Sequence, residues 1–240
     1  MTGVIGLVSL ACAILCAGGM QAPSVDNPDE LYRHREDLAS AARAADLWAQ
    51  HAGQDFEAAW KLSRVCYWLG THLPERARRR ALERGVNAGE TAIRLASNRP
   101  EGHFWLAANM GTLAESFGLI EGLKYRGRIK EELQRVLAID ASWQGGSAEA
   151  ALGQWYYEVP RLLGGSRPKA EEHLRRALAY DSKNLVALSF LAEVLASGNG
   201  HDEARTLLQQ ILDLPTSPEW APEDGDFKKQ ALERLTSLSR

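Results

Sequence analysis

Apolar and polar residues follow one another along this chain with the spacing of amphipathic helices, and the helical pattern recurs. Each recurrence ends in a short apolar tail, and the tails begin at Ala92, Val136, Ala177 and Ile211. Successive tails therefore start 44, 41 and 34 residues apart. A recurrence of this length predicts a stack of helical hairpins, because each hairpin alone cannot bury its apolar face.

A second landmark supports this prediction. A leucine followed by a small residue occurs in the first helix of each expected hairpin, and the small residues are Ser63, Ala107, Gly153 and Ala192. A small side chain lets the partner helix approach closely, so we expect all four residues to be buried. The last hairpin has the 34-residue length of a tetratricopeptide repeat.

The first three hairpins carry insertions that the last one lacks. These insertions include residues 71–74, 117–122 and 159–166. Insertions at one point of successive repeats lie along one edge of the array, which is often the binding edge. Loops that only tolerate growth are polar, whereas two of these three insertions are apolar, and this favours a binding edge.

Flanking elements complete the expected array. A helix is predicted from Pro28 to about Ala49, and its apolar side would carry Leu31, Leu38, Ala42, Ala45 and Trp48. A second helix is predicted over residues 226–238, capping the last hairpin with Phe227, Ala231, Leu235 and Leu238. The prediction is an all-α, tetratricopeptide-like helical-hairpin superhelix with four hairpins plus N-terminal and C-terminal flanking helices, forming one domain over residues 23–240.

Residues 1–22 carry no charged side chain and are mostly apolar. This pattern is typical of a secretory signal, and the small residues Ala17-Gly18-Gly19 would permit cleavage just after Gly19. The mature chain would then begin near Met20 or Gln21, and we expect it in the periplasm.

Two alternatives for this segment stay open. Acylation of Cys12 or Cys16 would make the chain a lipoprotein, although neither cysteine has a good acylation motif before it. An uncleaved helical anchor is the other alternative, since about 20 apolar residues can span a bilayer. If the signal is cleaved, Cys66 is the remaining cysteine, and we interpret it as a small buried apolar residue.

Charge and motif content exclude several classes of function. Lys and Arg total 28 against 31 for Asp and Glu, so a net charge of -3 offers no attraction for nucleic acid. No two of the six histidines lie three to five residues apart, as a helical metal site requires. The chain also has no nucleophile elbow and no phosphate-binding glycine loop. We therefore expect no nucleic-acid partner, no metal, no cofactor and no enzymatic activity.

Aromatic residues recur on the face of the first helices that this type of repeat directs towards its concave surface. The predicted binding set consists of Trp60, Arg64, Tyr67, Phe104, Ala108, Gln154 and Tyr157. Grooves lined in this way recognise peptides or apolar ligands. The competing interpretation is that these aromatic side chains belong to the core, where most large apolar residues lie.

Several motifs go beyond a generic repeat. They are residues 102–111, 139–146, 152–156 and 220–224, together with Pro160 and Gly164-Gly165-Ser166. Over residues 29–238 the chain resembles the T component of tripartite ATP-independent periplasmic (TRAP) transporters. The resemblance implies a periplasmic, often lipid-anchored repeat protein that associates with a substrate-binding protein, assembles as a homotrimer and handles apolar small molecules.

Two functions are expected from these observations. The first is a non-enzymatic transport accessory that docks a periplasmic substrate-binding protein or another envelope protein, or passes it a hydrophobic small molecule. The alternative is a general tetratricopeptide-repeat scaffold for protein assembly in the envelope.

Overall fold

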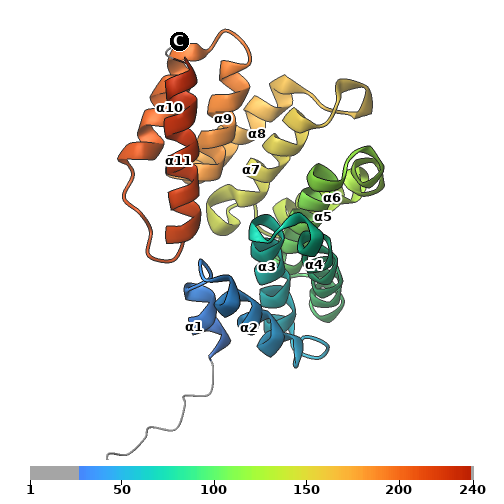
Figure 1. The fold of residues 1–240 in the computed structure, drawn as a ribbon. Helices are drawn as coiled ribbons and strands as arrows, with labels where there is room; N and C mark the ends of the chain where they lie inside the picture. Colours follow the sequence, from blue (N-terminus) through green and yellow to red (C-terminus); the bar gives the residue numbers. More distant parts are fainter. Residues whose placement is uncertain (1–26, 239–240) are drawn as a thin grey trace, which may run out of the picture.

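The structure, a computed structural model, describes residues 27–238. The expected signal or anchor, with Cys12 and Cys16, lies outside these residues. Within the described range the chain forms eleven α-helices and one short 3-10 helix, with no strand (Figure 1). The all-α prediction is confirmed.

Four helical hairpins stack side by side into a curved array (Figure 1). The elements are α1 (Pro28–Arg33), α2 (Leu38–Ala49), α3 (Phe56–His72), α4 (Glu75–Leu95), α5 (Pro100–Phe117), α6 (Leu119–Asp140), α7 (Trp143–Glu158), η1 (Arg161–Leu163), α8 (Arg167–Tyr180), α9 (Leu185–Ala196), α10 (His201–Asp213) and α11 (Ala221–Leu238). The hairpins pair α3 with α4, α5 with α6, α7 with α8 and α9 with α10. Helices α1 and α2 precede the array, and α11 packs on the last hairpin.

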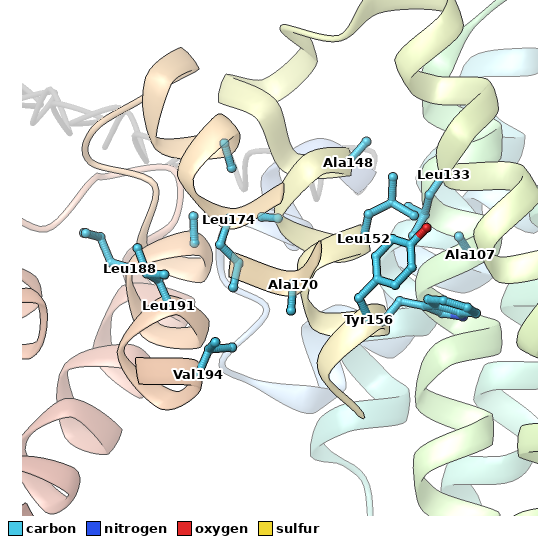
Figure 2. Close-up of a cluster of buried hydrophobic side chains, with 14 of the residues drawn as sticks. Ala107, Leu133, Ala148, Leu152, Tyr156, Ala170, Leu174, Leu188, Leu191 and Val194 are labelled. Carbon is cyan, nitrogen blue, oxygen red and sulfur yellow. The ribbon is translucent and has the colours of Figure 1, made fainter. Parts of the chain in front are cut away.

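The small landmark residues are buried at the close-packed points of the hairpins, as predicted. Ser63, Ala107, Gly153 and Ala192 are all buried, and so are the tail residues Ala92, Val136, Ala177 and Ile211. A Cβ atom added to Gly153 would lie 2.5 Å from the side chain of Leu174, so only glycine permits the observed approach of α8 to α7. Figure 2 shows the surrounding core, with Leu152 and Tyr156 on α7 near Ala170 and Leu174 on α8.

The N-terminal flanking element differs from the prediction. The single helix expected from Pro28 to about Ala49 is two helices, because the side chain of Asp37 accepts hydrogen bonds from the backbone amides of Ala39 and Ser40 and starts α2. Of the predicted apolar side, Ala45 and Trp48 are buried and Leu31 and Leu38 pack against the core, whereas Ala42 is exposed.

The C-terminal helix begins at Ala221, five residues before the predicted start at Asp226. Its residues Phe227, Ala231, Leu235 and Leu238 pack on the core, so the predicted cap is confirmed. Cys66 is fully buried, and this burial raises the pKa of its thiol to about 12.

The predicted insertions lie where the two helices of each hairpin join, and these junctions follow one edge of the array (Figure 1). Apolar side chains at two of them are open to solvent: Leu119 is 71% exposed, Ile120 is 81% exposed and Leu162 is 100% exposed. Among the helices of residues 27–238, none combines the length and apolar character needed to cross a bilayer.

Candidate functional site

The inner side of the array contains a cavity of about 1090 Å³. Its walls come from the first helices α3, α5 and α7, from α6, and from the start of α11. A further wall is the segment of residues 214–220 between α10 and α11, which we call the C-terminal strap. Most of the lining is apolar, as in sites that bind small molecules or protein segments.

The predicted binding set divides into two groups. Tyr67, Phe104, Ala108 and Gln154 line the cavity, whereas Trp60, Arg64 and Tyr157 are not among its lining residues. The geometry brings the first group together from three successive hairpins. Their role in binding remains a prediction.

Arg64 is held away from the cavity by aromatic rings. Its guanidinium carbon lies 4.0 Å from the centre of the Tyr32 ring and 4.9 Å from the Trp60 ring, and only 9% of the residue is exposed. Burial lowers the pKa of Arg64. The Trp60 indole nitrogen donates to Glu57. Arg64 thus fastens α3 to α1 by its cation–π contact with Tyr32, whereas its contact with Trp60 lies within α3.

A cluster of aromatic rings lies on one side of the cavity. The Trp105 ring centre lies 5.2 Å from that of Phe104 and 5.7 Å from that of Tyr67, and Phe104 contacts Trp143 at 5.0 Å. Trp105 is 5% exposed and lines the cavity, yet its indole N–H has no acceptor among residues 27–238. An unpartnered buried donor is costly and marks a place where an acceptor would be favourable.

A carboxyl pair stands on the cavity wall close to the hairpin junctions. The Gln154 amide nitrogen donates to Glu115 at 3.1 Å and to Glu158 at 2.9 Å, joining α5 to α7. Burial, the negative charge of Glu158 and a hydrogen bond with it raise the pKa of Glu115 to about 8. Sequence reasoning missed both glutamates, because they come from different repeats; their shared place near the ends of two first helices was the one available signal.

The C-terminal strap and the start of α11 lie close to α1 beside the cavity, whereas the C-terminal end of α11 lies at the opposite end of the molecule (Figure 1). Arg35 is 1% exposed and donates to both carboxylate oxygens of Glu223, with a distance of 2.9 Å from its Nε. Arg35 also donates to the Glu219 carbonyl of the C-terminal strap at 2.9 Å. Burial acts to lower the pKa of Arg35, but the hydrogen bond to Glu223 and the charges of Tyr32, Glu223 and Glu36 together outweigh it, so the pKa is raised.

The charges along the cavity are unbalanced. Six carboxylates line it, at Glu115, Glu158, Asp181, Glu219, Glu223 and Asp224, whereas its basic lining residues are Arg126 and Lys183. Residues 27–238 contain no group of three or more His, Cys, Asp or Glu side chains placed to hold a metal ion. The chemistry offered by this site is therefore apolar contact together with acidic hydrogen-bond acceptors.

Comparison with solved structures identifies the fold. A tetratricopeptide-repeat protein from Thermus thermophilus, TTC0263, is 24% identical and superposes with a TM-score of 0.64, covering 88% of this chain and 98% of its own. MamA is 16% identical with a TM-score of 0.49, covering 85% of this chain and 98% of its own. The tetratricopeptide-like prediction is confirmed by the first of these structures. No curated protein matches the sequence.

Sequence families divide the chain near the end of the third insertion. Residues 164–221 match the tetratricopeptide repeat, and residues 25–163 match the family described as regulator of microtubule dynamics protein 1-3. None of these matches points to the T component of TRAP transporters. Because the longer match spans more than half of the sequence, the chain belongs to the regulator of microtubule dynamics protein 1-3 family and ends in a tetratricopeptide repeat.

Proposed function

We propose that this chain is a non-enzymatic scaffold that binds a segment of another protein in its concave cavity. The observation that supports this most is the cavity of about 1090 Å³, lined by aromatic side chains from three successive hairpins. Stacked repeats present equivalent positions along one groove, and aromatic residues are the usual anchors of protein interfaces. A protein segment fits such a groove better than a compact metabolite would, because its side chains enter at regular intervals.

The name of the family, regulator of microtubule dynamics, is compatible with a protein that acts through protein contacts. It supports the scaffold function that we expected as the alternative. Docking of a periplasmic substrate-binding protein, in a homotrimer, would be one special case of this function, and no comparison favours that case. We therefore leave the partner at the level of a protein segment.

A second candidate function is uptake of an apolar small molecule. The volume and the mostly apolar lining of the cavity support it, since sites for such ligands are commonly about 300 to 1000 Å³. Native mass spectrometry of the purified chain, followed by solvent extraction, tests this function. A reproducible copurifying lipid or metabolite, absent after Ala108→Trp fills the cavity, would support it.

Site-specific photo-cross-linking tests the scaffold function. A photoreactive phenylalanine analogue at Ala108 faces the cavity, and the same analogue at Ala138 on the exposed side of α6 is the matched control. We expect a defined partner to cross-link at position 108 and not at 138, and Phe104→Ala to reduce the yield. Equal cross-linking at both positions would contradict binding in the cavity.

Export is a separate proposal, which the intact mass of the protein purified from its native cells tests. A chain beginning near Met20 or Gln21 would support a cleaved signal. A diacylglyceryl adduct on Cys12 or Cys16 would establish the lipoprotein alternative, and an unprocessed N-terminus would leave the uncleaved anchor.

A further inference from the structure

We infer that the concave cavity selects a protein segment carrying a lysine or arginine beside apolar residues, and that Glu115, Gln154 and Glu158 receive the basic side chain. This inference rests on the proposed binding of a protein segment. Beyond that function, it specifies the side chains that the bound segment must carry and the residues that recognise them.

The first argument is the state of the two carboxyl groups. Glu115 and Glu158 line the cavity and are held together by the Gln154 amide, at 3.1 and 2.9 Å. No lysine or arginine of residues 27–238 forms an ion pair with either glutamate. Both glutamates are exposed, and two carboxyl groups held side by side without a cation repel each other when both are ionised, which a bound cation would relieve.

Several other carboxylates of the array have a basic partner. Glu223 is paired with Arg35, Glu121 with Arg79, and Glu132 with His103. The basic residues that line the same cavity, Arg126 and Lys183, make no ion pair with the carboxyl pair. A carboxylate with a structural role would be paired with a basic residue of the same chain, as at these other sites. Glu115 and Glu158 have no such partner and open into the cavity, which suits a cation from another molecule.

The neighbouring wall suits the rest of such a segment. Phe104 and Ala108 offer apolar contact, and aromatic faces also attract a lysine or arginine side chain. Burial, followed by the charge of Glu115, raises the pKa of Tyr67 to about 12, so its hydroxyl stays a neutral hydrogen-bond donor.

Two other ligand types fit less well. An acidic segment would meet six lining carboxylates against two basic residues, and like charges across an interface oppose binding. A purely apolar segment would remove water from the carboxyl pair without supplying a cation, which costs free energy. Charge complementarity therefore favours the basic segment.

A peptide selection tests the inference on the full chain. Random twelve-residue peptides displayed on phage are selected on the purified protein, and the enriched peptides are synthesised and their dissociation constants measured. We expect the enriched peptides to contain lysine or arginine next to apolar residues. Replacing that basic residue by glutamine should weaken binding at least tenfold.

A double-mutant cycle assigns the contact to the carboxyl pair. The variant E115Q/E158Q should weaken binding of the basic peptide at least tenfold and leave binding of the glutamine peptide unchanged. The control E131Q/E233Q removes the same charge from two exposed glutamates outside the cavity lining and should have no effect. Helical content by circular dichroism confirms that each variant is folded.

The outcomes separate this inference from the proposed function. Suppose that the selected peptides lose affinity for Ala108→Trp or Phe104→Ala and keep it for E115Q/E158Q. This result would overturn the selectivity for a basic residue and leave cavity binding intact. Enriched peptides without basic residues would do the same. Peptides insensitive to both Ala108→Trp and Phe104→Ala would overturn cavity binding itself, and the selectivity with it.

Discussion

The N-terminal hairpins and the last hairpin use different side-chain chemistry where their helices pack together. Around α3, α4 and α5 the contact is polar: the Asn109 amide, fully buried, donates to the Ser63 carbonyl at 3.0 Å, and the Ser63 hydroxyl donates to the Gly85 carbonyl at 2.8 Å. Between α9 and α10 the equivalent contact is made by small and aliphatic side chains, Ala192 and Ala204 among them. Buried hydrogen bonds thus supplement apolar packing at one end of the array.

This difference coincides with the division between sequence families. The polar hairpins lie within the residues that match the regulator of microtubule dynamics family, and the aliphatic hairpin lies within the generic tetratricopeptide match. The cavity is built mainly on the former. The regular repeat therefore supplies the end of the scaffold, and the irregular repeats supply the site.

The largest expected effect tests how much the N-terminal region depends on buried polar contacts. Arg35→Ala should lower the free energy of unfolding by about 3 to 5 kcal/mol, because it leaves Glu223 and the Glu219 carbonyl without their donor. Chemical denaturation measures the loss. Arg33→Ala, whose side chain is 60% exposed, is the matched control and should cost about 0.5 kcal/mol or less. Equal losses in both variants would contradict the buried ion pair.

At the aliphatic end, Ala192→Leu should lower the free energy of unfolding by about 1 to 3 kcal/mol through overpacking. Ala192 is 1% exposed, so its added atoms have no free space. Ala138→Leu on the exposed face of α6 provides the control. A loss near zero at position 192 would remove it from the close-packed points of the array.

Asn109→Ala should lower the free energy of unfolding by about 1 to 2 kcal/mol, since the amide donates to the Ser63 carbonyl and hydroxyl and to the Trp105 carbonyl. Thermal and urea denaturation measure this change. The exposed Asn199→Ala serves as the control. If Asn109→Ala were as stable as wild type, aliphatic packing would suffice at both ends and the comparison would fail.

The smallest effect concerns pH and the carboxyl pair. Folding raises the pKa of Glu115 from its ordinary 4.5 to about 8, so the folded chain holds this proton more tightly than the unfolded chain does. The contribution to stability is complete below about pH 4.5 and falls as the pH rises towards 8. In Glu115→Gln the loss of unfolding free energy with rising pH should be smaller than in wild type, by about 1 kcal/mol after allowance for solvent screening.

Denaturation midpoints at about pH 5 and about pH 9, on either side of the raised pKa of Glu115, measure this difference. Glu131→Gln, an exposed glutamate on α6, should keep the wild-type pH dependence. Identical pH dependence in Glu115→Gln and wild type would show that the Glu115 carboxyl titrates normally.

Sequence reasoning succeeded where the determinants are local and repeated. The small landmarks from Ser63 to Ala192 and the apolar tails recur at helical spacing, and each reports a contact within one hairpin. The break before Leu38 was missed, because the apolar pattern continues through it and only the cap of Asp37 interrupts the helix.

The candidate site was only half predictable for the same reason. Tyr67 and Phe104 follow from the repeat position, since equivalent residues share one face. The pairing of Glu115 with Glu158 depends on how two hairpins stack, and that of Arg35 with Glu223 joins residues 188 positions apart. The spacing of apolar residues along the chain predicts neither contact.

The Arg35–Glu223 pair also changes the mechanics of the array. An open solenoid behaves like a spring, because each repeat touches only its neighbours and small rotations add up along the stack. Here Arg35, just after α1, is bonded to Glu223 at the start of α11 and to the Glu219 carbonyl of the C-terminal strap. Widening the array at this point would mean pulling a buried guanidinium from its carboxylate.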